Sequence, residues 1–485
     1  MTIKNIFKTI VFGVLMCLTY SCNDFLDINT DPNRVAQAPL STQLTGSITA
    51  TSSNHFSAAN TISQITQHLA AAAANGSADT HNEIRLAGLW TGAYLNAMTN
   101  LTDIVKNAPA ANSPHFSGVA RVLMAINLGL ATDVWGDVPY TEAFKLEKSF
   151  YPTYDSQQSV YTNIQALLDG AIADLGQTTS VFKPSATDDL IYGGNISKWL
   201  KLAKALKARY AIHLTKKGGA AAANAAIAAL SGAMADNSDD MQLAYNAAIL
   251  NPWNSVALGN NTGNFTVRPS EQLADAMNGT TYGVWDPRLP VITGVRTAIT
   301  NTWKGNVNGT GIGGVLDLLV TSYYSTTAAP IVMMTFSEQK FIEAEARFIA
   351  NGGNAASTGT TAEAYKAYLD GIDANMKKIG VPDTGRTRYL ADPKVAVGAT
   401  SLKLSHIMVE KWKALFLHAE AWTDMRRYDY SGAIYKDLTL PANHNVSLSG
   451  QWIRRAEYPF DEFSRNGEQV RKAVKPANDK MWWDQ

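Results

Sequence analysis

The chain has 485 residues, 41 basic and 41 acidic side chains and two cysteines, and 46% of its residues are hydrophobic. This composition supports a large buried core and excludes a disordered chain, a disulfide scaffold and a collagen-like fibre. A formal net charge of zero also argues against a nucleic-acid-binding protein, in which basic residues usually exceed acidic ones.

Residues 1–21 have the features of a secretory signal peptide. Lys4 and Lys8 give a positively charged start, a short apolar stretch covers residues 9–18, and the small residue Ser21 precedes a cysteine. This apolar stretch is too short for a transmembrane helix, and no later stretch reaches the roughly 18 apolar residues that such a helix needs. Export is therefore expected.

Cys22 stands where a lipoprotein signal peptidase would cut. It would become the first residue of the mature chain, and its acyl chains would anchor a protein that does not itself cross the membrane. Loss of the signal also discards Cys17, so the mature chain has one cysteine and no disulfide. Without Lys4 and Lys8, 39 basic residues face 41 acidic ones. A secreted protein with a free Cys22 is the alternative.

The mature chain divides into a tether and a folded body. Residues 22–53 are polar and rich in turn-forming residues, which predicts a lipidated N-terminal tether. Residues 54–485 are interpreted as a single α-helical domain with an irregular insert at about 236–334.

Helical periodicity dominates the folded body. Apolar residues recur at three- and four-residue steps in segments 84–105, 116–134, 155–175, 197–214, 220–235, 336–350, 361–379 and 402–428. They group into pairs: 117–134 with 155–176, 197–216 with 220–235, and 336–351 with 361–380. Two-helix units of this kind must stack to bury their apolar faces, as in a degenerate tetratricopeptide array. The expected fold class is all-α.

The insert at about 236–334 has a different character. It is rich in Asn, Gly and Thr, carries scattered aromatic residues, and shows little helical period. Long irregular segments inside compact proteins are often functional. This segment is therefore where we expect a ligand to bind.

Four motifs in chain order resemble the SusD/RagB family of outer-membrane nutrient-binding lipoproteins. They are CNDFLDINTDPN at 22–33, TDVWGDVPYTEA at 132–143, FIEAEARFIANG at 341–352, and MVEKWKALFLHAEAWTDMRRYDY at 408–430. Together they extend over nearly the whole mature chain. The similarity is greatest to the SusD-like subgroup.

The resemblance implies an all-α body of tetratricopeptide-like pairs with an irregular ligand-binding region. Members of the family lie on the cell surface over a SusC-like, TonB-dependent outer-membrane transporter. They capture oligosaccharides, or peptides in some branches, and pass them inward without catalysis. The resemblance thus predicts a lipid-anchored surface protein with a glycan ligand, a transporter partner, no cofactor and no nucleic-acid partner.

Aromatic residues of the insert are the candidate ligand-binding residues, because the apolar face of a pyranose packs on an aromatic ring. They are Trp253, Tyr282, Trp285, Trp303, Tyr323 and Tyr324. Nearby in sequence are possible hydrogen-bonding partners of sugar hydroxyls, namely Asn254, Asp286, Arg288 and Asn306. The alternative for each ring is a small core beneath the loops. Four other tryptophans fall on helical stripes and are assigned to the core: Trp90, Trp199, Trp412 and Trp422.

A secreted all-α glycoside hydrolase is the main alternative function, and a scaffold that binds only protein is another. A hydrolase needs two opposed carboxylates at a set separation. Glu343 and Glu345 point to different faces of one helix, and Glu410 and Glu420 lie almost three turns apart. The histidines show no metal-ligand spacing. No catalytic residue and no metal site are therefore predicted.

Overall fold

The computed structural model describes residues 38–145, 149–296 and 302–485. The predicted signal peptide and Cys22 lie outside these residues. The helices of the described part, in chain order, are α2 (Leu40–Ile65), α3 (Ala87–Thr91), α4 (Thr99–Asn107), α5 (Pro114–Trp135), α6 (Gln157–Leu175), α7 (Ile196–Ile212), α8 (Thr215–Ala229), α9 (Pro252–Asn261), α10 (Glu271–Met277), α11 (Leu289–Ile292), α12 (Phe336–Ala350), α13 (Ala362–Lys378), α14 (Asp383–Ala391), α15 (Leu404–Ala414), α16 (Glu420–Arg427), α17 (Phe460–Arg465) and α18 (Gly467–Ala473). A π-helix, η1 (Gly92–Met98), joins α3 to α4, and the short 3-10 helices include η4 (Tyr323–Ser325) and η7 (Trp482–Asp484).

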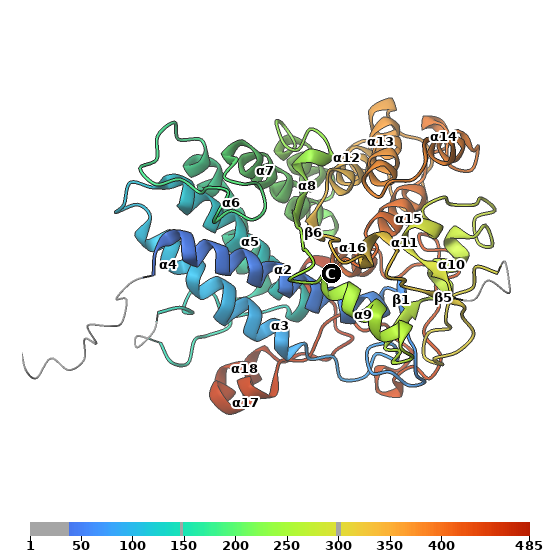
Figure 1. The fold of residues 1–485 in the computed structure, drawn as a ribbon, viewed down its shortest axis with the longest axis horizontal. Coiled ribbons are helices and arrows are strands. Elements are labelled where there is room, and N and C mark those ends of the chain that lie inside the picture. Colours follow the sequence, from blue (N-terminus) through green and yellow to red (C-terminus); the bar gives the residue numbers. More distant parts are fainter. Residues whose placement is uncertain (1–37, 146–148, 297–301) are drawn as a thin grey trace, which may run out of the picture.

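The main helices form one array, in which each helix packs on the next. Helix α5 packs against α6, α6 against α7, α7 against α8, α8 against α12, and α12 against α13 (Figure 1). The array therefore continues directly from residue 229 to residue 336, although about a hundred residues intervene in the sequence. The three predicted helix pairs are all present, and the predicted all-α class is confirmed.

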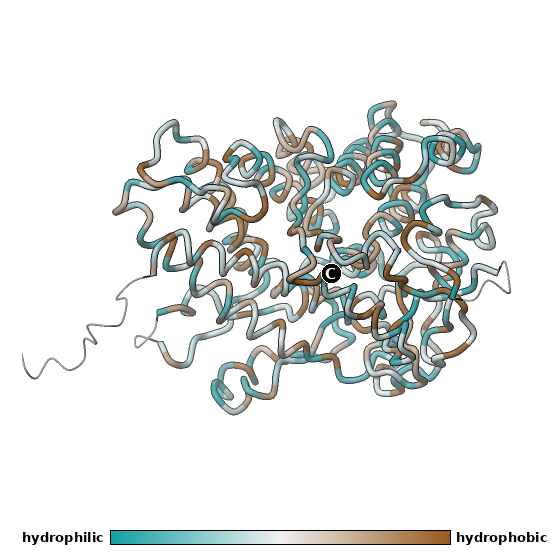
Figure 2. Tube along the Cα trace, viewed as in Figure 1, coloured by the Kyte–Doolittle hydropathy of each residue, from teal (hydrophilic) through white to brown (hydrophobic). Residues whose placement is uncertain are grey.

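Helix α5 is the one described helix that is long and apolar enough to span a membrane by length and composition. However, 89% of its most apolar window is buried among the other helices, so it is a core helix of the array. Hydrophobic and hydrophilic residues alternate along the helices of the array (Figure 2).

The segment between α8 and α12 leaves the array and returns to it at nearly the same place. Strand β2 (Met241–Leu243) pairs antiparallel with β6 (Ile331–Met334), with Met241 opposite Met334. Between them, β4 (Gly294–Val295) pairs with β5 (Leu316–Asp317). A third pair joins β3 (Val267–Pro269) to β1 (Leu69–Ala71), which follows α2. These small sheets fix the irregular segment at the end of the molecule that carries α10 and α11 (Figure 1).

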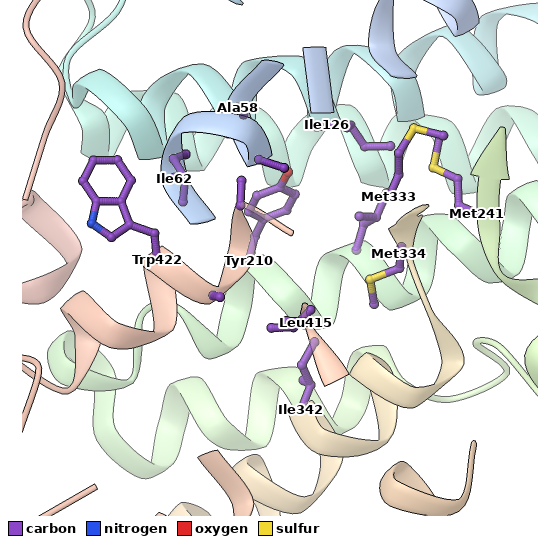
Figure 3. Packing of buried hydrophobic residues seen from close by; sticks show 14 of the residues in the cluster. Ala58, Ile62, Ile126, Tyr210, Met241, Met333, Met334, Ile342, Leu415 and Trp422 are labelled. Atoms are coloured by element: carbon purple, nitrogen blue, oxygen red, sulfur yellow. The ribbon is translucent and has the colours of Figure 1, made fainter. Parts of the chain in front are cut away.

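The predicted tether extends too far, because residues 40–53 form the first half of helix α2. Leu44 and Ile48 are fully buried. The many Ser and Thr residues suggested a linker, but within the helix their hydroxyls donate to backbone carbonyls four residues earlier, for example Thr51 to Ser47 at 2.7 Å. Further along, Ala58 and Ile62 of α2 face Tyr210 and Trp422 in the centre of the core (Figure 3).

If α2 is part of the core, Ile48→Ala should lower the free energy of unfolding by about 2–5 kcal/mol, because it leaves a cavity in a fully buried site. The neighbouring exposed residue provides a matched control: Thr49→Ala should change it by less than about 0.5 kcal/mol. Chemical denaturation of both variants measures the difference. Equal stability of the two variants would mean that this segment does not pack in the core.

Two long predicted helices are interrupted. Segment 84–105 consists of α3, the π-helix η1 and α4. Segment 402–428 is divided into α15 and α16 by residues 415–419, where Leu417 has a positive φ of 60°. His418 stabilises the break: its Nδ1 accepts a hydrogen bond from the backbone N–H of Glu420 at 3.0 Å, and its Nε2 bonds the carbonyl of Met333 at 3.0 Å. The break directs Leu415 and Phe416 into the core.

A chain of buried hydrogen bonds crosses the helix array. Tyr161 donates to Asp133 at 2.6 Å and lies 2.9 Å from Nδ1 of His213, whose Nε2 lies 2.5 Å from Glu420. Because the Tyr161 proton points to Asp133, Nδ1 of His213 must donate to Tyr161. A neutral His213 then accepts the proton of a protonated Glu420. Burial supports this state, since it raises the pKa of Glu420 to about 7 and lowers that of His213 to about 3.

The raised pKa of Glu420 has a defined effect on stability. Its contribution is present below the ordinary pKa of 4.5 and is lost as the pH rises through about 7. Glu420→Gln keeps an N–H donor for His213 and cannot titrate. Between these pH values the wild type should therefore lose about 1–3 kcal/mol of unfolding free energy relative to the variant. Urea denaturation across this pH range measures the unfolding free energies, with the exposed Glu363→Gln as control. If the difference in unfolding free energy between the wild type and Glu420→Gln does not change with pH, Glu420 is not protonated in the folded protein.

Candidate ligand-binding site

Trp285 and Trp303 form an aromatic pair on the surface of the irregular segment. Their ring centroids are 5.5 Å apart and their planes meet at 78°, an edge-to-face arrangement. Trp285 is 44% exposed and Trp303 is half-buried. Trp285 lies in the connection between α10 and α11. The pair presents an open apolar surface of the kind on which the face of a sugar ring packs.

Hydrogen bonds from three parts of the chain hold the backbone around this pair. Asn278 donates from its side chain to the carbonyl of Trp303 at 2.9 Å. Lys394, which is 111 residues away in the sequence, donates to the carbonyl of Gly283 at 2.6 Å. Lys436 donates to the carbonyl of Thr281 at 3.0 Å. Both lysines are exposed, and their ammonium groups lie on the backbone of the segment that carries Trp285.

A buried cluster of four charges includes Asp286, the residue that follows Trp285. Arg288 forms a two-point contact with Asp286, with Nε at 2.9 Å from one oxygen and Nη2 at 2.6 Å from the other. Arg288 also contacts Glu410, and Lys413 lies 2.8 Å from Glu410 and 3.4 Å from Asp286. Two cations thus balance two carboxylates. Although burial raises the pKa of Asp286, the adjacent charge of Arg288 outweighs it and lowers that pKa to about 2.

Tyr282 belongs to the same neighbourhood as the tryptophan pair. It is half-buried, and Nζ of Lys413 lies 5.4 Å from its ring centroid. Its ring therefore rests on the buried charge cluster. It lies three residues before Trp285 in the same connection between α10 and α11.

The other three predicted aromatic residues lie elsewhere. Trp253 is only 2% exposed and packs edge-on against Phe56 of α2, with centroids 4.9 Å apart. Tyr324 is buried between Tyr323 and Phe416. Tyr323 is half-buried against Tyr324. The interpretation of Trp253 and Tyr324 as ligand contacts is therefore wrong: they connect the irregular segment to the helical core.

The four predicted polar partners are likewise buried and already bonded. The Asn254 side chain donates to the carbonyl of Ser325 at 2.7 Å, and Asn306 accepts from Gly314 at 3.1 Å. Asp286 and Arg288 bond each other in the charge cluster. In a segment with few helices and strands, Asn side chains such as these bond the backbone N–H and C=O groups that regular secondary structure would otherwise pair. Lys394 and Lys436 are exposed polar groups that no local sequence signal identifies, and Lys304 beside Trp303 is exposed as well.

The carboxylates considered for acid/base catalysis have structural partners. Glu345 accepts from Arg427 at 2.7 Å, and Glu343 is paired with Arg347. Glu410 belongs to the charge cluster and Glu420 contacts His213. Within residues 38–145, 149–296 and 302–485, no group of three or more His, Cys, Asp or Glu side chains could hold a metal ion.

An array of paired helices interrupted by one irregular segment is the architecture of a helical-repeat protein. A family model for SusD-like proteins, described as starch-binding associating with outer membrane, matches residues 32–459. Because this match covers most of the sequence, the chain belongs to the SusD-like family, as its motifs predicted. No curated protein matches the sequence.

Solved structures agree with this assignment. A SusD homologue from Bacteroides uniformis superposes with a TM-score of 0.76 at 23% identity and covers 92% of this chain and 99% of its own. A SusD/RagB family protein from Bacteroides thetaiotaomicron gives 0.74 at 20% identity, covering 92% and 99%. A chitin-binding SusD homologue from Flavobacterium johnsoniae gives 0.72 at 22% identity, covering 91% and 98%. At these identities the similarity establishes the fold.

Proposed function

We propose that the chain is a cell-surface glycan-binding protein that captures oligosaccharides on the Trp285–Trp303 pair. The observation that carries this proposal is an exposed edge-to-face tryptophan pair held on a rigid charged base, in a family described as starch-binding. The rings supply apolar stacking for a pyranose, and Lys394 and Lys436 supply hydrogen-bond donors for its hydroxyls. The open geometry suits a chain longer than a single sugar.

The proposal extends to the location and partner of the protein. The family is described as associating with the outer membrane. A lipid on Cys22 would tether the folded body there, with residues 22–39 as the linker, since helix α2 begins at Leu40. A SusC-like, TonB-dependent transporter would receive the captured glycan. A pull-down of the lipidated chain from outer membranes, with a Cys22→Ala variant as control, tests the anchor and the partner together.

Affinity electrophoresis in gels that contain a soluble polysaccharide tests the ligand. Soluble starch and glycol chitin are the first choices, because the family description and a structural relative name starch and chitin. Retardation by at least one polysaccharide, without change in its chain length, is the expected result. Release of shortened products would instead indicate a glycoside hydrolase. Retardation by none, together with binding of oligopeptides, would favour the peptide-binding alternative.

A further inference from the structure

A pocket lies beside the C-terminal part of the chain. Its volume is about 500 Å³, and it lies between the segment before α3, which supplies Arg85, and the C-terminal segment from Arg455 to Ala477. Helix α17 forms one wall, at the lower edge of the molecule in Figure 1. None of the residues that line it belongs to the Trp285–Trp303 site. A pocket of this volume can hold a monosaccharide-sized ligand.

One wall of the pocket is apolar and exposed. Phe460 is 68% exposed at the start of α17, with Phe463 and Val474 beside it. The guanidinium of Arg85 lies over the Phe460 ring, 3.7 Å from its centroid, and pairs with Glu457. This contact fixes the orientation of the ring from one side. Phe460 thus provides a flat surface for the apolar face of another ring.

The opposite wall carries a buried positive charge without a carboxylate partner. Arg455 is 3% exposed, and its hydrogen bonds go to the backbone carbonyls of Asp479 and Lys480, the shortest at 2.8 Å. Among the described residues, no carboxylate oxygen lies within 4 Å of it. Burial lowers the pKa of Arg455, and the more distant acidic groups, among them Tyr458, Asp137 and Asp479, offset that effect only in part. Its Nη1 takes no part in these hydrogen bonds.

The remaining charges of the lining leave an excess of cations. Arg85 is matched by Glu457, and the exposed Lys475 is matched by Asp137 at 3.1 Å, which lies outside the lining. Arg455 therefore has no ion-pair partner among the residues of the lining. An anion entering the pocket would pair with Arg455 and complete its hydrogen bonding, and it would gain further attraction from Lys475.

We propose that this pocket binds a ring that carries a carboxylate, the chemistry of a uronic acid residue. The ring packs on Phe460, and the carboxylate accepts from Arg455 and Lys475. An aromatic ring with a carboxylate would make the same contacts. The experiment must therefore distinguish a uronic acid from an aromatic acid. The protein would then hold two separate sites, one for a neutral glycan segment and one for an acidic residue.

Calorimetric titration of the full mature chain with methyl β-D-glucuronide, methyl β-D-glucoside and benzoate tests this proposal. The glucoside has the same ring but no carboxylate. Glucuronide is expected to bind about tenfold or more tightly than glucoside, the effect of one charge-assisted hydrogen bond. Stronger binding of benzoate would identify an aromatic acid as the source. Absence of binding by both carboxylates, or equal affinity for glucuronide and glucoside, would overturn the proposal.

Variants at exposed positions locate the binding without affecting the fold. Phe460→Ala should weaken glucuronide binding about tenfold, and Lys475→Ala should weaken it a few-fold and reduce its salt dependence. Lys472→Ala provides the matched control, because Lys472 is exposed on α18 outside the lining and should leave binding unchanged. Trp285→Ala should also leave it unchanged, which separates this pocket from the proposed glycan site. Unaltered binding in Phe460→Ala would place the ligand elsewhere.

Discussion

Substitution of Trp285 by alanine is expected to weaken glycan binding by about ten- to a hundredfold, the loss typical of a central aromatic residue in a binding site. Trp285 is the more exposed ring of the pair, so it offers the larger stacking surface. The underlying charge cluster holds the loop in place, so the loss should come from the ring itself. Calorimetric titration with the oligosaccharide of the polysaccharide that retards the wild type gives the affinity.

Trp285→Phe and Phe182→Ala are the controls for this experiment. Trp285→Phe retains an aromatic surface and should recover part of the affinity. Phe182 is 59% exposed on a different part of the surface, so its removal should have no effect on binding. If Phe182→Ala and Trp285→Ala bind the glycan equally well, the pair is not the site.

Arg288→Met is expected to lower the free energy of unfolding by about 3–5 kcal/mol. The substitution leaves the buried carboxylates of Asp286 and Glu410 with only Lys413 as a cation. The same variant should weaken glycan binding, because Trp285 directly precedes Asp286 in the loop that the cluster fixes. Chemical denaturation and calorimetric titration of one preparation measure both effects. Lys472→Met, in an exposed ion pair, is the control and should change stability by less than about 0.5 kcal/mol.

A double variant separates charge balance from packing at this cluster. Arg288→Met combined with Glu410→Leu removes one charge of each sign and leaves Asp286 paired with Lys413. It should therefore be more stable than Arg288→Met alone. If the double variant loses as much unfolding free energy as the two single variants together, the cluster stabilises the fold by packing and not by its balanced charges.

The helical array could be predicted from the sequence because apolar periodicity determines it. Helices α5 to α8 and α12 to α13 bury continuous apolar faces, so the spacing of those residues is visible in the sequence. The first half of helix α2 resembles a tether in the sequence because it is rich in Ser and Thr, whose hydroxyls in the structure bond to the helix backbone. The break after α15 was missed because its cause is tertiary: Leu415 and Phe416 pack in the core, and His418 bonds Met333.

The candidate site could be assigned to a segment but not to individual residues. Trp253 stands between Pro252 and Asn254, and Trp285 precedes Asp286 and Pro287, so both tryptophans have a proline and a polar residue beside them in the sequence. Only the fold places Trp253 against Phe56 in the interior and Trp285 against Trp303 at the surface. The donors Lys394 and Lys436 come from distant segments, and their contacts depend on how the irregular segment folds back on the array.

Affinity electrophoresis of the Trp285→Ala/Trp303→Ala double variant tests glycan capture by the pair most directly. The wild type and the variant are run side by side in gels with and without the polysaccharide that retards the wild type. Capture on the pair predicts that the wild type is slowed and that the folded variant migrates as it does without polysaccharide. Equal retardation of the two proteins would contradict it and would place the glycan site elsewhere on the fold.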